Sequence, residues 1–120
     1  MFQELTRTAG PGTPLAAMAR GLDLRLMLGV DGDDTLVVIR DGAVTDIVPG
    51  PHVMIPWDAR IAATASAWEG HLAALPRPGF HDIFALLRAG TLRFEGNLLP
   101  VMQHLLYIKR LLQSLRPEVA

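Results

Sequence analysis

Four histidines are the side chains of this sequence best suited to metal binding or general-base chemistry: His52, His71, His81 and His104. No two of them have the His-x-x-x-His spacing that places two imidazoles on one turn of a helix. His71 and His81 flank one loop and could approach each other there. Without a ligand-pair spacing, however, we interpret all four as surface side chains.

Other short motifs favour catalysis no more strongly. Asp31-Gly32-Asp33-Asp34 begins like a calcium loop but lacks the later ligands and the closing Glu, so we predict a solvated turn. Ser66 and Ser114 have no Gly-x-Ser-x-Gly context, and Gly10-Pro11-Gly12 is not followed by the lysine of a phosphate-binding loop. We therefore predict a protein that is not an enzyme, with no catalytic residues, no metal and no cofactor.

Length and composition favour one domain with a sizeable apolar core. The chain has 120 residues, half of them hydrophobic, and no cysteine. A formal net charge of −1 gives no electrostatic reason to bind nucleic acid. No apolar run approaches the roughly 20 residues that span a bilayer, and the first residues lack a signal-peptide pattern. We expect a cytoplasmic protein with no transmembrane segment.

In the first half of the chain, the sequence pattern predicts a short helix followed by three strands of an antiparallel meander. Residues 1–12 are predicted to be a loose lead-in. Thr13-Pro14 then forms an N-cap with proline at the first helical position, and the helix covers residues 15–20. Apolar alternation predicts strands at 22–30, 35–40 and 43–48, the last two joined by the tight turn Asp41-Gly42.

The second half mixes both element types. A short extended piece at 52–55 precedes a fourth strand at 57–64, helices at 65–75 and 80–88, a fifth strand at 91–95 and a terminal helix at 97–115. An isolated late strand is not stable in water, so it must join the sheet. These elements predict an α+β fold, a five-stranded mostly antiparallel sheet with helices packed on one face.

The terminal helix has a wider apolar face than burial against a sheet requires. At 100° per residue it predicts a polar face made of Gln103, Tyr107, Arg110 and Ser114. The apolar excess lies in the first three turns, where Leu98, Met102, Leu105 and Leu106 either roof an apolar cavity or contact a second copy of the chain. Trp57 and Trp68 could stack on a ligand, but Trp68 is spaced from Leu72 as a core residue is.

Taken in order, several motifs resemble the sterol carrier protein (non-specific lipid transfer) domain family. They are Asp41-Gly42, Asp58-Ala59-Arg60-Ile61, the helix around Trp68, the spacer Pro76-Arg77-Pro78, the helix around Phe84, and Gly90-Thr91-Leu92-Arg93-Phe94-Glu95-Gly96-Asn97. The resemblance covers residues 15–115. It implies helices on one side of a five-stranded sheet, with an apolar tunnel between them for a fatty-acyl or sterol-like ligand. The alanine- and arginine-rich composition is similar to that of bacterial members, some of which accompany enzymes or support quinone synthesis. The ending Glu118-Val119-Ala120 is not a peroxisomal signal.

Two functions stay open at this stage. The first is non-catalytic binding or transfer of an apolar lipid (fatty-acyl, sterol-like or prenyl-quinone-like) in the tunnel, with Arg88, Arg93 or Lys109 neutralising a carboxylate. The alternative is a dimerisation or scaffold module of the same fold, a homodimer or partner of an enzyme, with no working tunnel. A weaker third is an enzyme whose site a partner chain completes. The predicted ligand-binding residues are Trp68, Leu72, Ile83, Phe84, Leu87, Leu92, Phe94, Leu98, Met102, Leu105 and Leu106.

Overall fold

The computed structural model describes residues 1–52 and 55–117 and is built on one five-stranded sheet. The strands lie in the order β3-β2-β1-β4-β5, and among these described strands only the β1–β4 pair is parallel. This confirms the predicted mostly antiparallel sheet, which the late strand joins as an edge strand. The strands are β1 Leu24–Val30, β2 Asp33–Arg40, β3 Ala43–Pro49, β4 Ala59–Ala63 and β5 Leu92–Gly96.

Two tight turns set the register of the meander. Asp31 and Gly32 have φ of 50° and 90°, and Asp41 and Gly42 have φ of 49° and 81°. Two successive positive φ values are the signature of a mirror-image turn, whose twist matches that of the strands it joins. The aspartate-rich segment is therefore a hairpin turn, as predicted.

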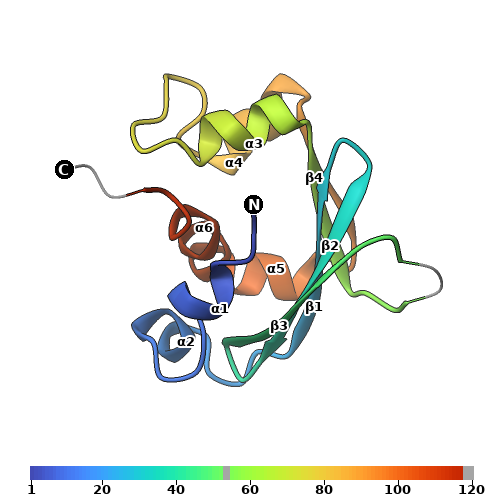
Figure 1. Ribbon diagram of the computed structural model, residues 1–120, viewed down its shortest axis with the longest axis vertical. Coiled ribbons are helices and arrows are strands. Elements are labelled where there is room, and N and C mark those ends of the chain that lie inside the picture. The colour runs from blue at the N-terminus through green and yellow to red at the C-terminus, as the bar shows by residue number, and fades with distance from the viewer. Residues whose placement is uncertain (53–54, 118–120) are drawn as a thin grey trace.

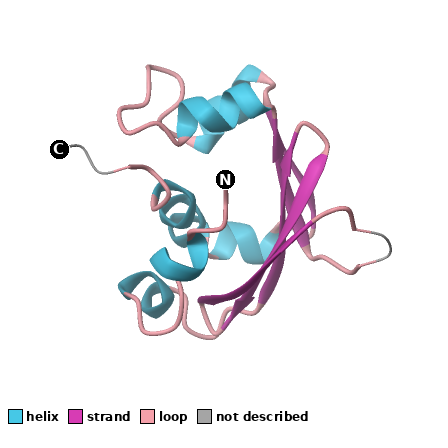
Figure 2. Ribbon diagram, in the orientation of Figure 1, coloured by secondary structure: helices cyan, strands magenta, loops and turns pink. Residues whose placement is uncertain are grey.

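The helices of the described chain lie on one face of the sheet, with the α3–α4 pair over one end and the other four over the opposite end (Figures 1 and 2). Side-chain oxygens of Thr13, Thr64 and Asp82 cap the starts of α2, α3 and α4. The helices are α1 Leu5–Thr8, α2 Pro14–Met18, α3 Ala65–His71, α4 Ile83–Ala89, α5 Leu99–Gln103 and α6 Leu105–Gln113. No helix among the described residues has the length and apolar character needed to cross a membrane.

The first twelve residues are packed rather than loose. They contain α1, and Phe2, Leu5 and Ala9 are buried in the main core. The backbone carbonyl of Ala9 accepts a hydrogen bond of 2.8 Å from the amide of Val44 on β3. Because three apolar side chains turn inward, this segment completes the helical layer instead of preceding it.

Two helix boundaries lie three or more residues from the prediction. Helix α4 begins at Ile83 rather than residue 80, because the Asp82 side chain accepts from the Phe84 amide and caps the helix there. Helix α3 ends at His71, short of residue 75. The extended piece expected at 52–55 lies partly outside the described residues.

The terminal helix is broken in two at His104. This residue has φ −118° and ψ 33°, so α6 does not continue the rotation of α5. The single helical wheel drawn through residues 97–115 is therefore wrong in its second half. Tyr107, placed on the polar face by that wheel, is 2% exposed and donates a hydrogen bond of 2.7 Å to the Gly42 carbonyl. Burial raises the pKa of Tyr107 to about 12.

Candidate functional site

Trp68 is the central side chain of the space between the sheet and the α3–α4 pair. Thr64 caps α3 and so places Trp68 one turn into the helix, facing the sheet. The side chain is fully buried, and its indole Nε1 donates a hydrogen bond of 2.8 Å to the carbonyl of Gly29 on the central strand. The large apolar ring is thus fixed in place by its one polar atom.

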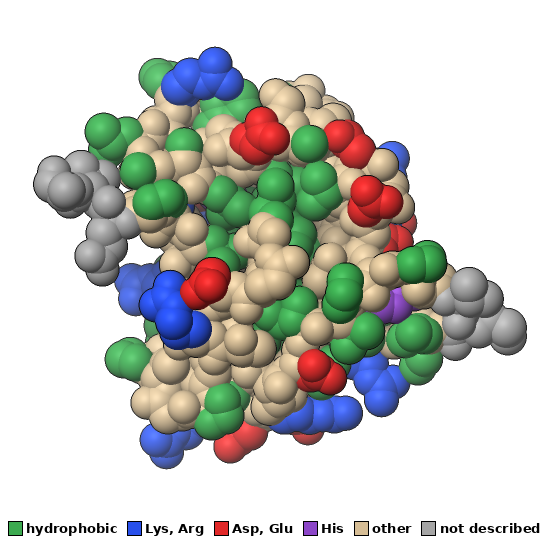
Figure 3. Space-filling model, in the orientation of Figure 1, with side chains coloured by type: hydrophobic (Ala, Val, Ile, Leu, Met, Phe, Trp, Pro, Cys, Tyr) green, Lys and Arg blue, Asp and Glu red, His purple; other side chains and the backbone are tan. Residues whose placement is uncertain are grey.

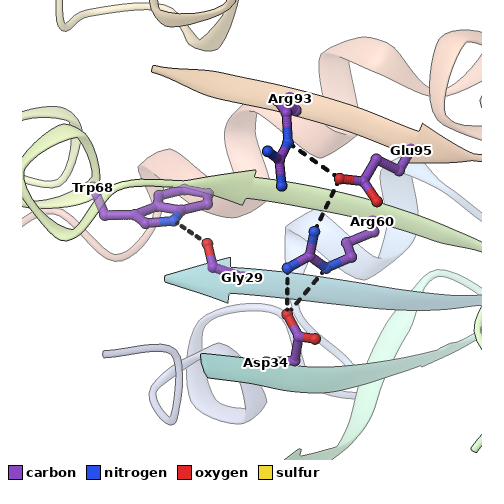
Figure 4. Close-up of polar contacts among 6 residues, drawn as sticks. All are labelled: Gly29, Asp34, Arg60, Trp68, Arg93 and Glu95. Atoms are coloured by element: carbon purple, nitrogen blue, oxygen red, sulfur yellow. Dashed lines mark hydrogen bonds and ion pairs between the residues drawn. The ribbon is translucent and has the colours of Figure 1, made fainter. Parts of the chain in front are cut away.

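On the opposite face of the sheet, Arg60 crosses β1 directly over Gly29 (Figure 4). The guanidinium binds Asp34 on β2 through Nε and Nη2, at 3.0 and 2.9 Å, and Glu95 on β5 through Nη1 at 3.0 Å. A Cβ atom at position 29 would lie 2.7 Å from Arg60 Nη2. The missing side chain of Gly29 is what allows this ion network to span four strands.

Phe2 packs edge-on against Trp68 on the helical side. The two ring centroids are 5.2 Å apart and the planes are inclined by 81°, which is a favourable aromatic geometry. Figure 1 shows the N-terminal residues between the α3–α4 pair and α6, beside the sheet. The chain's own N-terminal segment therefore fills the space around Trp68.

His71 is the buried polar residue of this region. Its Nδ1 lies 2.8 Å from the carbonyl oxygen of Phe80, which can only accept, and 3.3 Å from Arg116 Nη2, which can only donate. Because the contact to Phe80 is much the shorter, we assign the proton to Nδ1. Burial lowers the pKa of His71 below 6.5, and the nearby Arg116 charge lowers it further against the opposing effect of the Phe80 bond. The lowered pKa favours the neutral ring at pH 7, and the buried Nε2 has no hydrogen-bond partner among the described residues. The expectation that all four histidines lie on the surface is wrong for His71, because Trp68 and the 72–81 loop enclose it.

Arg116 holds that loop closed from the C-terminal side. Its Nε donates to the carbonyl of His71 at 2.7 Å, and its Nη2 donates to the carbonyl of His81 at 2.9 Å. Residues 71 and 81 do approach each other, as the sequence allowed, but through their backbone carbonyls and one shared guanidinium.

A second polar contact ties α4 to α6. Lys109 Nζ lies 2.9 Å from Asp82 Oδ2 and 4.7 Å from the centroid of the Phe84 ring. Burial acts to raise the pKa of Asp82, but the hydrogen bonds from Lys109 and the Phe84 amide outweigh it and the pKa is lowered. Phe84 in turn packs on Phe94 of β5, with centroids 5.9 Å apart.

The eleven predicted ligand-binding residues divide by depth. Trp68, Ile83 and Leu92 belong to the buried core, and Leu72 and Phe94 pack against its edge. The remaining six lie outside that core: Phe84, Leu98 and Leu105 are half-buried, whereas Leu87, Met102 and Leu106 are 37%, 41% and 57% exposed. The structure thus places the first five in or against one buried core and the last three on the surface of α4, α5 and α6.

Surface hollows do not coincide with these residues. A hollow of about 390 Å³ is lined by residues of segments 11–20 and 40–45. A second, of about 270 Å³, lies at the ends of β4 and β5, and a third, of about 590 Å³, lies between the β1–β2 turn and residues 49–52. None of the eleven residues lines any of the three. Of the cations expected to meet a carboxylate, Lys109 is paired with Asp82, Arg93 lies 3.2 Å from Glu95, and Arg88 is exposed.

Sequence reasoning missed Phe2 and Leu5, although a signal for them exists. Phe2, Leu5 and Ala9 follow the i, i+3, i+7 spacing of one helical face, which the nearby Gly10-Pro11-Gly12 masks. The buried environment of His71 has no such signal. It depends on Arg116 meeting α3 and the 72–81 loop in space.

Comparison with solved structures shows which fold this is. No model of a known protein family matches the chain, and no curated protein matches it in sequence. A conserved hypothetical protein from Thermus thermophilus, described as a suggested sterol carrier protein, has a TM-score of 0.67 at 16% identity over 98% of this chain and 87% of its own. UbiJ-SCP2, a ubiquinone synthesis protein, has a TM-score of 0.57 at 16% identity over 94% of this chain and 90% of its own.

A third similar structure is part of an enzyme. The inverting sec-alkylsulfatase Pisa1 from Pseudomonas sp. has a TM-score of 0.60 at 16% identity over 86% of this chain but only 15% of the enzyme. At this identity the likeness concerns the fold alone. The chain therefore has the α+β fold of sterol-carrier-like proteins, as the sequence motifs predicted.

Proposed function

We propose that this protein binds a single apolar lipid between its sheet and its helices and carries it without chemical change. The supporting observation is the composition of the interior. Among the described residues, His71 is the only buried side chain that is not of a hydrophobic or aromatic type, and the polar atoms of Trp68 and Tyr107 are bonded to backbone carbonyls. A binding site for a fatty-acyl, sterol-like or prenyl-quinone-like ligand needs this kind of lining with few polar groups.

The fold likeness supports the same function from an independent direction. Two of the similar structures carry sterol carrier or SCP2 in their descriptions, and one of these is a ubiquinone synthesis protein. Both match this chain over most of their own length. From these proteins the proposal takes only the class of ligand, a water-insoluble molecule. It does not take a particular lipid from them.

Native mass spectrometry of the purified protein tests this function. We expect additional mass corresponding to one lipid per chain, either co-purified or after incubation with palmitic acid, hexadecanol, cholesterol or a prenylated quinone. The proposal would be contradicted if only the mass of the chain itself were found under all these conditions. A cooperative thermal unfolding transition of the same sample would show that the protein was folded.

A further inference from the structure

The N-terminal segment, residues 1–8, is bound to the rest of the molecule mainly by its apolar side chains. Phe2 is 2% exposed and Leu5 is fully buried, whereas Met1 next to them is 48% exposed. The intervening polar residues are exposed on the opposite side of α1. Two inward-facing side chains thus carry the contact between this segment and the core.

The hydrogen bonds of residues 1–7 stay within the first nine residues. The Phe2 carbonyl accepts from the Leu5 amide, Arg7 binds Glu4, and the Glu4 and Leu5 carbonyls accept from the residues that close α1. Polar attachment to the rest of the fold begins only at Thr8, whose Oγ1 lies 2.8 Å from Ser114 Oγ, and at Ala9, bonded to Val44. Departure of residues 1–8 therefore breaks a single hydrogen bond to the described chain beyond Ala9, the one between Thr8 and Ser114.

An apolar ligand can replace what this segment provides. Apolar contact is non-directional and scales with the area removed from water, so an alkyl chain covers Trp68 as Phe2 does. Ala9-Gly10-Pro11-Gly12 follows immediately, and Gly12 has the positive φ of 83° that glycine adopts readily. The space-filling view shows hydrophobic side chains gathered at the centre of this face, between the α3–α4 pair and the lower helices, with charged side chains around the margin (Figure 3).

His71 adds a polar feature next to Trp68. Its ring centroid is 6.5 Å from that of Trp68 on the same helix, and its enclosed Nε2 is an acceptor with no donor among the described residues. A buried polar atom without a partner is uncommon and destabilising. A ligand headgroup that donates a hydrogen bond would satisfy it, as a hydroxyl or a protonated carboxyl does and an ether or ester does not.

We propose that the lipid-binding site is the space now filled by Phe2 and Leu5 against Trp68. Residues 1–8 leave this space when lipid enters. The ligand is a single-chain lipid whose headgroup donates a hydrogen bond to His71 Nε2. This inference rests on the proposed lipid-carrying function. In this proposal the lipid binds on the inward side of the helical layer. The exposed residues of α5 and α6, on the outward side, do not form the site.

Quenching by a brominated lipid measures occupation of this site directly. With Trp57→Phe as the background, Trp68 is the sole tryptophan, and hexadecanol brominated along its chain is expected to quench it. Phe2→Ala is expected to bind this probe about tenfold more tightly, because apparent affinity is reduced by the fraction of molecules whose site is closed. Leu24→Ala, an equally buried substitution on β1, serves as the matched control and is expected to leave affinity unchanged.

The possible results distinguish a failure of the assigned binding site from a failure of the proposed lipid-carrying function. Equal tightening by Phe2→Ala and Leu24→Ala, or lipid binding by mass spectrometry without quenching of Trp68, contradicts the assigned site while the carrier function stands. No binding by parent or variants contradicts both.

A reversible tether provides a test that does not depend on creating a cavity. The chain has no cysteine, so Thr8→Cys with Ser114→Cys introduces a single pair where two hydroxyl oxygens lie 2.8 Å apart, close to the approach a disulfide needs. Oxidation is expected to weaken binding of the same probe about threefold or more by restraining α1, and reduction is expected to restore it. Equal binding in both states, with disulfide formation verified by mass, overturns the displacement of the segment.

The headgroup is tested by comparing hexadecanol with its methyl ether. The alcohol is expected to bind about fivefold more tightly, the value of one hydrogen bond, and His71→Phe is expected to abolish the difference. Equal affinity of alcohol and ether in the parent protein overturns the role assigned to Nε2.

Discussion

Two apolar regions of this protein lie on opposite sides of its helical layer, the interior around Trp68 and the outer surface of α5 and α6. Trp68 and Phe2 are 0% and 2% exposed, whereas Leu99 and Leu106 are 64% and 57% exposed. Both regions follow from the same composition, in which half of the residues are hydrophobic. The interior differs in having polar atoms at defined positions, the indole bonded to Gly29 and the His71 nitrogen left without a partner among the described residues. Apolar content alone therefore does not locate a ligand site, and the few polar atoms within it are more informative.

The largest contrast between the two regions is expected in stability. Trp68→Ala removes a fully buried ring and its hydrogen bond to Gly29, and we expect it to lower the free energy of unfolding by about 3–5 kcal/mol. Leu106→Ala on the outer surface is expected to change it by less than about 0.5 kcal/mol. Urea denaturation measures both, and similar losses for the two variants would show that the α5–α6 surface is covered in solution.

A buried hydroxyl provides an intermediate effect. Tyr107→Phe keeps the ring but leaves the Gly42 carbonyl without the bond of 2.7 Å, so we expect a loss of about 1–2 kcal/mol. Met102→Gln, a polar substitution at an exposed position of α5, is the matched control and is expected to be close to neutral. A neutral Tyr107→Phe would mean that another donor replaces the hydroxyl at Gly42.

The interior contains a buried histidine, His71, and the outer surface of α5 and α6 does not. The interior should therefore make the stability of the protein depend on pH. Because the folded-state pKa of His71 is below 6.5, the unfolded chain takes up a proton first as pH falls. Stability is therefore full above pH 6.5 and declines as pH falls below it, levelling off once the folded state also binds the proton. Denaturation at a series of pH values measures this decline, and His71→Phe is expected to remove it. An unchanged profile in that variant would assign the decline to other groups.

The smallest expected effect concerns the outer surface and lipid. Leu99→Gln combined with Leu106→Gln is expected to leave both the unfolding free energy and hexadecanol affinity unchanged, because neither side chain belongs to the buried core. Fluorescence titration and sedimentation velocity check this. Loss of lipid affinity in this double variant would indicate that the lipid binds at the α5–α6 surface. A change from dimer to monomer in sedimentation would favour a scaffold role.

The sequence predicted the sheet well because local signals there are strong. Alternation in Leu22–Val30 and the Asp-Gly pairs define strands and turns without help from distant residues. The late strand was also recognisable, with Leu92 facing the core and Arg93 facing outward. The predicted fold class and the order of elements follow from such patterns.

The candidate site was less predictable because it depends on distant contacts. The break at His104 rotates α6, so a helical wheel extrapolated through it put Tyr107 on the outside, whereas Tyr107 is buried. The inward turn of Phe2 depends on Trp68, which is 66 residues later in the numbering of the chain. No local pattern specifies either arrangement.

Gly29 has a consequence for how this sequence can vary. Its carbonyl holds the tryptophan on one face of the sheet, and its bare Cα gives Arg60 room on the other. A side chain at this position must displace the guanidinium, and with it the contacts to Asp34 and Glu95. The charged exterior therefore depends on glycine at this position, whereas the bond to Trp68 needs only the backbone carbonyl that every residue has. Among related sequences, a residue other than glycine at position 29 is expected to accompany a change at position 60.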